Sequence, residues 1–270
     1  MEAQMLSNLA GKVALVTGST GGIGRGAALR LAALGATVVV TGRTPHKGEA
    51  VVAQIRDGGG KSIFIAGDVL SKPHMDALCA RVAEACGGLD IVVANAGGND
   101  DEARSPQVRG PFGDLDLARV TALIGDATTA KLLPVQSALP YMLKRGGGSV
   151  VFVTSEGGRV PTSGQTAVAT FSGGLIMATK VLAKELAREN VRVNCVAVTV
   201  VRDTPSWQAM QGAGAMSAHH KQQYEKIEAM SPLGLASPQD IGAVIAFLAS
   251  SDSRYVTGAT LSATGGLTFS

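Results

Sequence analysis

Glycines crowd the segment Thr17–Gly24, which reads TGSTGGIG. A short apolar run precedes this segment, and a helical pattern of apolar residues follows it. Backbone N–H groups at the start of a helix bind anions, and glycines let a phosphate group approach the backbone closely. A glycine-rich turn without a ligand is the simpler alternative. The arrangement predicts a pyrophosphate site of a dinucleotide, with these residues at the ligand: Gly18, Ser19, Thr20, Gly22, Ile23 and Gly24.

The end of the second apolar run, Thr37–Gly42, bears on which dinucleotide fits. An acidic residue at this point usually binds the ribose 2′-hydroxyl of NAD. Gly42 offers no carboxylate, and Arg43 follows it. A guanidinium suits a 2′-phosphate, so the sequence favours NADP(H) as the cofactor. An arginine that is only solvated is the alternative.

Ser155 and Glu156 stand at the end of another apolar run and carry groups that could handle a proton. Ser155 could donate a hydrogen bond to a substrate, and Glu156 could serve as an acid. Arg159, three residues further on, could bind an anion. The alternatives are a serine that caps a turn and two charges that are solvated. Ser155 and Glu156 are the candidate catalytic residues.

The elements that position these residues repeat along the chain. Short runs that are apolar on both faces alternate with helical patterns, which is typical of parallel strands covered by helices. We therefore expect an α/β fold, a Rossmann-like doubly wound parallel sheet in a single domain. Residues 9–100 would form the nucleotide-binding half, and residues 101–270 the substrate and oligomerisation half. The expected strands are Lys12–Gly18, Thr37–Gly42, Ser62–Val69, Leu89–Gly97, Ser149–Ser155 and Val191–Val198.

Ligands of such sheets bind at the carboxyl ends of the strands. Two irregular segments interrupt the regular alternation, Gly97–Asp116 and Arg202–Pro232. Each is longer than an ordinary connection, so each is a candidate lid or substrate loop.

The composition narrows the class of function. The 24 Lys and Arg residues nearly balance the 21 Asp and Glu residues, without long runs of one sign, which argues against nucleic-acid or membrane-surface partners and for a small-molecule substrate. The first residues include no apolar leader, and we expect no later run to approach the roughly 20 apolar residues of a membrane span. The expectation is therefore a cytoplasmic protein. The cysteines at 79, 86 and 195 lack metal-ligand spacing, so we expect reduced thiols and no metal site.

With these residues placed, the chain resembles the short-chain dehydrogenase/reductase family from about Leu9 to its C-terminus. TGSTGGIG is similar to the family's TGxxxGxG turn. Asp68 and Val69 resemble the pair that lies beside the adenine, and Asn95, Ala96 and Gly97 match the family's NAG. Stretches such as LPYMLKRGGGS and ELARENVRVNCVA are also similar to family sequences. The resemblance implies a dinucleotide-dependent oxidoreductase.

The resemblance also implies four catalytic positions, a serine, a tyrosine, a lysine and an asparagine. Ser155 fits the serine. Counting along the chain puts Val168 at the tyrosine position, Ser172 at the lysine position, and Ala127 or Thr128 at the asparagine position. The Pro-Gly pair that usually lies against the nicotinamide reads Val198 and Thr199.

Three functions fit a protein with these replacements. The first is a redox enzyme that manages the proton differently, acting on a conjugated enone or an iminium. The second is a lyase, dehydratase or cyclase, for which His219, His220 and Glu225 are candidate acid–base residues. The third is a nucleotide-binding protein or an inactive subunit. The intact nucleotide motifs favour the first and the third over the second, and the missing Pro-Gly pair favours the third over the first. The redox enzyme is the preferred interpretation, and the other two stay open.

Family members commonly assemble into dimers or tetramers, so the resemblance implies an oligomer. We expect a homotetramer, and the alternative is a hetero-oligomer with an active relative. The helical pattern near residues 173–187 is apolar over a broad surface, wider than one core stripe needs. The residues assigned to that surface are Leu175, Ile176, Ala178, Thr179, Leu182, Ala183 and Leu186.

Overall fold

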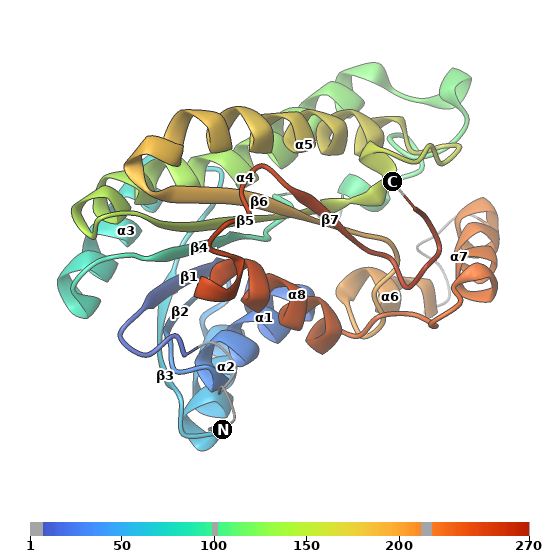
Figure 1. Cartoon of the computed structure of the whole chain (residues 1–270). Coiled ribbons are helices and arrows are strands. Elements are labelled where there is room, and N and C mark those ends of the chain that lie inside the picture. The colour runs from blue at the N-terminus through green and yellow to red at the C-terminus, as the bar shows by residue number, and fades with distance from the viewer. Residues whose placement is uncertain (1–7, 99–101, 212–217, 270) are drawn as a thin grey trace.

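Seven parallel strands form one sheet in the computed structural model, which describes residues 8–98, 102–211 and 218–269 (Figure 1). The strand order is β3-β2-β1-β4-β5-β6-β7, which reverses direction between β1 and β4. This is the order of a doubly wound sheet, and it places the ligand site at the carboxyl ends of the central strands. The strands are β1 Val13–Thr17, β2 Thr37–Gly42, β3 Lys61–Ala66, β4 Ile91–Ala94, β5 Gly148–Ser155, β6 Val191–Val198 and β7 Thr260–Ala263.

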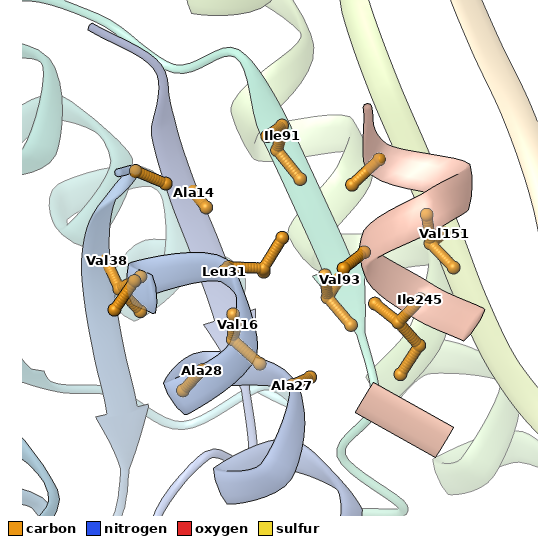
Figure 2. Close-up of a cluster of buried hydrophobic side chains, with 14 of the residues drawn as sticks. Ala14, Val16, Ala27, Ala28, Leu31, Val38, Ile91, Val93, Val151 and Ile245 are labelled. Atoms are coloured by element: carbon orange, nitrogen blue, oxygen red, sulfur yellow. The ribbon is translucent and has the colours of Figure 1, made fainter. Parts of the chain in front are cut away.

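Each central strand sends alternate side chains to opposite faces of the sheet. In β1, Val13 and Leu15 join one hydrophobic core, and Ala14 and Val16 join the other. Figure 2 shows the second of these cores, in which Ala14 and Val16 lie near Leu31. Burial on both faces explains why these strands are continuous apolar runs rather than alternating ones.

Three helices cover each face of the sheet (Figure 1). The helices α1, α2 and α8 pack on the face drawn in Figure 2, and α3, α4 and α5 pack on the other. The contact between α1 and α8 is close because both contribute glycine: a Cβ on Gly26 would lie 2.1 Å from the carbonyl oxygen of Pro238. The six helices are α1 Gly22–Ala33, α2 Pro45–Asp57, α3 Lys72–Cys86, α4 Leu117–Lys144, α5 Thr166–Leu186 and α8 Pro238–Ala249.

The expected fold class is confirmed, and all six expected strands are present with ends shifted by a few residues. The seventh strand, β7, is short and contains two hydroxyl residues, so its sequence carries no clear apolar run. It pairs with β6 from Cys195 to Val198 and closes the edge of the sheet.

The two irregular segments contain short helices. The first holds η1 Glu102–Arg104 and η2 Phe112–Asp114, and residues 99–101 lie outside the described part. Arg119 of α4 binds Glu102 with two hydrogen bonds of 2.7 Å, which ties this segment to α4. The second segment holds α6 Pro205–Gln211 and α7 Ala218–Met230, and residues 212–217 between them are not described.

The expectation that no segment matches a membrane span by length and composition was wrong. Residues Thr166–Glu189, which include α5, are long and apolar enough, with a mean hydropathy of 1.4 over the best window. In the fold, however, α5 buries Leu175, Ile176 and Ala183 against the sheet, as a core helix does. Its apolar character therefore has an explanation in packing.

The apolar surface expected on α5 is also mostly core. Of the seven residues assigned to it, Leu175, Ile176, Thr179, Ala183 and Leu186 are buried within the chain. The side chains of α5 that remain exposed and apolar are Met177 and Val181, at 57% and 55% exposure. Any partner of this helix would contact these two residues.

Candidate active site

A cleft of about 970 Å³ lies at the carboxyl ends of the central strands. The glycine turn after β1 forms one side of it, and the ends of β4, β5 and β6 form the other. The start of α6 approaches across the turn, since Thr204 and Pro205 also line the cleft. Ten of the twelve residues expected at the cofactor line it: Gly18, Thr20, Gly22, Ile23, Arg43, Asp68, Val69, Asn95, Ala96 and Gly97.

The glycine turn needs glycine for two reasons, a left-handed backbone and a close backbone contact. Gly18 has a φ of +63°, in the left-handed region. A Cβ on Gly24 would lie 2.3 Å from the carbonyl oxygen of Gly18, so a side chain cannot enter without moving the turn. Helix α1 begins just after the turn and has no acidic residue in its first turn. The positive end of this helix therefore faces the cleft without a carboxylate to neutralise it.

Ser19 and Gly24 are the two expected cofactor residues that do not line the cleft. The buried hydroxyl of Ser19 donates to the carbonyl of Val16 at 2.7 Å and accepts from the N–H of Thr41 at 3.0 Å. These bonds join the ends of β1 and β2. Ser19 thus shapes the turn through its side chain, and Gly24 does so through its lack of one.

Asn95 couples the end of β4 to the glycine turn. Its amide donates to the carbonyl of Thr17 at 3.1 Å and to that of Gly18 at 3.3 Å. In return, the hydroxyl of Thr17 accepts from the backbone N–H groups of Asn95 and Ala96. These bonds fix the relative position of the two loops that a dinucleotide would cross.

Basic side chains gather at the end of the cleft beside β2. Arg25, Arg43 and Lys47 all line it, and all three are exposed. Asp68 and Val69 line the same end, after β3. The carboxylate of Asp68 accepts from the N–H of Leu70 at 3.0 Å, which holds it in place. This end can therefore bind a phosphate group through several cations.

Ser155 lies at the opposite end of the cleft, where β5 ends. Its hydroxyl accepts a hydrogen bond of 3.1 Å from the N–H of Gly157 and so caps η3 Glu156–Gly158. A Cβ built on Gly157 would have Ser155 Oγ at 3.2 Å and Val168 Cγ1 at 3.8 Å. Ser155 and Val168 therefore both lie next to Gly157, but Val168 does not line the cleft, and its side chain offers methyl groups rather than a hydroxyl.

Glu156 points away from the cleft and does not line it. Its carboxylate is buried, accepts from Arg159 at 2.8 Å, and accepts from the hydroxyl of Ser262 on β7 at 3.3 Å. Arg159 also donates to the carbonyl of Thr260. These two charges are not solvated as the simpler alternative held. They form a buried ion pair that fastens the end of β5 to β7.

Helix α5 brings no ionisable group into the cleft. Phe171 lines it, and Ser172 is fully buried with a hydroxyl that makes no hydrogen bond within the described structure. Among the described residues that line the cleft there is no tyrosine. Tyr141 packs with the core on the α3, α4 and α5 face, and Tyr255 is fully exposed.

Lys131 of α4 lines the cleft, although no sequence motif predicted it there. It is 4% exposed, and its ammonium donates to the carbonyl oxygen of Asn95 at 2.6 Å. A signal existed in the sequence. Lys131 shares the buried stripe of α4 with Leu123, Ala127 and Val135, at helical spacing, and a lysine on such a stripe is rarely accidental.

The cleft suits a dinucleotide phosphate by shape and by donors. The glycine turn admits a phosphate, and cations surround the end of β2. Thr41 and Thr154 also line the cleft, but their hydroxyl oxygens are buried and make no hydrogen bond within the described structure. The described residues contain no cluster of three or more His, Cys, Asp or Glu side chains that could hold a metal ion. The side chains of His219 and His220 lie outside the described part, and Glu225 is exposed.

Comparison with known proteins agrees with this geometry. Residues 18–268 match the family model described as enoyl-(acyl carrier protein) reductase. The chain is 34% identical over 261 residues to 3-oxoacyl-[acyl-carrier-protein] reductase of Aquifex aeolicus, covering 96% of this chain and 98% of the relative. It is 30% identical over 263 residues to 7α-hydroxysteroid dehydrogenase of Clostridium sardiniense, covering 97% and 95%.

Solved structures give the same result. A 7α-hydroxysteroid dehydrogenase complexed with NADH and 7-oxo glycochenodeoxycholic acid superimposes with a TM-score of 0.83 at 28% identity, covering 96% of this chain and 95% of that one. A short-chain type dehydrogenase/reductase from Mycobacterium marinum also gives 0.83 at 28% identity, covering 97% and 98%. The doubly wound sheet with its nucleotide cleft defines a Rossmann-like oxidoreductase. The chain belongs to the short-chain dehydrogenase/reductase family.

Proposed function

We propose that this protein binds NADP(H) and is an oxidoreductase that acts on a small organic substrate without a tyrosine and lysine proton relay. One observation carries the proposal. The cleft keeps a glycine turn and a basic phosphate end, while Ser155 lines the other end and Val168, at the position where the family carries its tyrosine, has no proton to donate. The nucleotide-binding half then comes from residues 9–100, and Ser155 and Thr199 supply part of the substrate half.

The preference for NADP(H) over NAD(H) rests on charge. Arg43 follows Gly42 at the end of β2, and Arg25 and Lys47 line the same end of the cleft. A 2′-phosphate bears about two negative charges, and a guanidinium can bind it through two parallel hydrogen bonds. A carboxylate at position 42 would repel that group, and Gly42 has none.

The chemistry that the dinucleotide supplies when bound is hydride transfer. Reduction of a ketone also places a proton on its oxygen, and a positioned acid typically contributes about 10²- to 10⁴-fold to the rate. Ser155 can donate a hydrogen bond to that oxygen, but a serine hydroxyl is a weak acid and Val168 donates nothing. Conjugated enones and iminium ions fit better, because they accept hydride without an immediate strong acid.

The relatives leave the substrate open. Their names specify a 3-oxoacyl group on a carrier protein and a hydroxysteroid, which differ in size and polarity. The apolar residues Phe171 and Val198 line the substrate end of the cleft of this chain. They favour an apolar group next to the reacting atom.

A nucleotide-binding subunit without catalysis of its own is the second candidate. The absence of a tyrosine among the described residues that line the cleft favours it. Glu156, the other residue expected to be catalytic, is held by Arg159 and could act on a substrate only if that ion pair opened.

Calorimetric titration with NADPH and with NADH tests the proposal. Wild type should bind NADPH at least tenfold more tightly than NADH, because hydrogen bonds to a charged group contribute about 1.5–3 kcal/mol. Arg43→Ala should remove most of this difference in affinity. Lys61→Ala is the control, since Lys61 is exposed at the opposite end of the sheet. Binding of neither dinucleotide would refute the redox function.

A substrate screen separates the two candidates. The protein that binds NADPH is mixed with conjugated enones, iminium ions and simple ketones, and loss of NADPH absorbance is followed. Turnover of enones or iminium ions supports the oxidoreductase. Binding without any turnover, together with recovery of an active relative in the same complex, would support the inactive subunit.

The homotetramer and the cytoplasmic location stay predictions. The exposed apolar residues Met177 and Val181 on α5 support a contact between copies at that helix. Size-exclusion chromatography with light scattering should give about four times 27.4 kDa, and the double change Met177→Glu with Val181→Glu should lower the mass. A wild-type monomer would refute the assembly.

A further inference from the structure

Lys131 carries a charge in the protein interior, where an unpaired charge is unfavourable. Lys131 is 4% exposed, and it lies between the apolar residues Ala127 and Val135 on the buried face of α4. Burial of an ammonium is unfavourable unless it has partners, and its bond of 2.6 Å to the carbonyl of Asn95 is one of them. Lys131 also lines the cleft, so its charge is held at the edge of the ligand space.

Its place along the cleft identifies what it would meet. The pyrophosphate of a dinucleotide lies at the glycine turn after β1, and the basic end at β2 takes the adenosine half. Asn95 follows β4, which lies on the other side of β1 and next to β5. Lys131 therefore stands on the side of the cleft that takes the nicotinamide half.

Helix α5, which packs beside α4, supplies no charge to this side. Ser172 stands four residues after Val168, is fully buried, and does not line the cleft. Its surroundings are tight, because a Cβ on Gly158 would lie 2.9 Å from Ser172 Cβ. Among the described residues that line the cleft, Lys131 is the one lysine or arginine on the β4 and β5 side.

We propose that Lys131 binds the hydroxyl groups of the nicotinamide ribose, so that α4 supplies the cation that family members with the usual motif carry on α5. This inference rests on the proposed binding of NADP(H). An ammonium has three donors, and a ribose offers two neighbouring hydroxyl oxygens as acceptors. The bond to Asn95 aims the amine at that position. The competing explanation is a strut, in which Lys131 only fastens α4 to the end of β4.

Two ligands separate these explanations. NADPH contains the nicotinamide ribose, and adenosine 2′,5′-bisphosphate contains only the adenosine half. Lys131→Met should weaken NADPH binding about tenfold or more in calorimetry, and leave adenosine 2′,5′-bisphosphate binding unchanged. Lys144→Met, an exposed lysine at the end of the same helix, should change neither.

The other outcomes are equally informative. An equal loss of affinity for both ligands in Lys131→Met would show a strut and overturn the inference, and unchanged affinity for both would overturn it as well. Wild type that binds neither ligand would refute the proposed function itself. If Lys131→Met does not fold, Lys131→Gln carries the same test, because its amide can still donate to Asn95 while the charge is gone. It should show the same selective loss of NADPH affinity.

Discussion

The two ends of the cleft are built by different means. At the nucleotide end, the shape comes from the backbone of Gly18 and Gly24 and from bonds that Ser19 makes to its neighbours. At the chemical end, the shape comes from side chains on three elements, with Phe171 on α5, Ser155 on β5 and Lys131 on α4.

This difference explains how the ends can diverge separately. At the nucleotide end, a Cβ on Gly24 would strike the backbone of Gly18, so a substitution there disturbs the turn itself. At the chemical end, one side chain can replace another while the helices keep their packing. A chain can therefore keep the family's fold and nucleotide cleft and change its chemistry.

The largest expected effect is a gain at the chemical end. Val168→Tyr would place a phenol beside Ser155, and if Lys131 supplies the cation, no lysine at position 172 is needed. A positioned acid contributes about 10²- to 10⁴-fold, so NADPH-dependent reduction of simple ketones should rise within that range. The rate of NADPH oxidation measures it.

Val168→Phe is the matched control, because it has the same ring without the hydroxyl. The gain should also vanish when Lys131→Met is added to Val168→Tyr. Equal rates for the tyrosine and phenylalanine variants, both with NADPH bound, would show that the chemical end has lost more than the side chain at position 168. The double change Val168→Tyr with Ser172→Lys then asks whether a cation on α5 restores the reaction.

A loss of stability should follow from changing Glu156, which follows Ser155 but contacts Arg159 and Ser262 instead of lining the cleft. Glu156→Gln leaves Arg159 without its carboxylate partner in a largely buried place. Removing one partner of a buried pair costs about 3 kcal/mol of the free energy of unfolding. Urea denaturation should show this loss, and Glu49→Gln on the exposed face of α2 should not. Unchanged stability with lost turnover would instead restore Glu156 as a catalytic candidate.

A smaller effect is expected at the nucleotide end. Gly24→Ala puts a methyl group against the carbonyl of Gly18, and overpacking of this kind costs about 1–3 kcal/mol. The affinity for NADPH should fall about tenfold or more in calorimetry. Gly21→Ala is the control in the same turn, because a Cβ there meets nothing within 4 Å. Equal losses for both alanines would mean that flexibility, rather than close approach, is what the turn requires.

The sequence predicted the nucleotide end better than the chemical end. Glycine spacing reports the backbone directly, and four residues of the glycine turn line the cleft. Six more expected residues that line it follow the second, third and fourth strands, and the strands themselves followed from apolar runs. Glu156 could not be placed the same way. Its partner Ser262 is 106 residues distant along the chain, and only the pairing of β6 with β7 brings it near.

Lys131 shows a different limit. A motif search asks whether a residue stands at its usual position, and Lys131 stands on another helix. Only the packing of α4 against β4 shows that it reaches Asn95. The exposed face of α5 was misjudged for a related reason, since periodicity gives the width of an apolar face but not how much of it the sheet covers.

The smallest expected effect concerns the thiol of Cys195, on β6 beneath the chemical end. Burial raises the pKa of this thiol to about 12, against smaller lowering effects from the charge of Lys131 and a hydrogen bond with Thr179. At pH values between about 8.5 and 12, the folded thiol therefore keeps its proton, whereas the thiol of the unfolded chain, with a pKa near 8.5, has lost it. The unfolded state binds fewer protons in that range, so this contribution to stability is complete below about pH 8.5 and is lost as the pH rises toward 12.

Cys195→Ala removes this titration, so its stability should fall less with pH than that of wild type. The difference should be about 1 kcal/mol between pH 8 and pH 9.5 in urea denaturation. The methyl group also leaves a cavity, which lowers stability at every pH equally, so only the change with pH is diagnostic. Cys86→Ala is the comparison, because burial raises the pKa of this partly buried thiol as well, and its effect on the pH dependence should be smaller. Identical pH dependence of wild type and Cys195→Ala would mean that water reaches β6 from the cleft, and that the chemical end is less closed than its packing indicates.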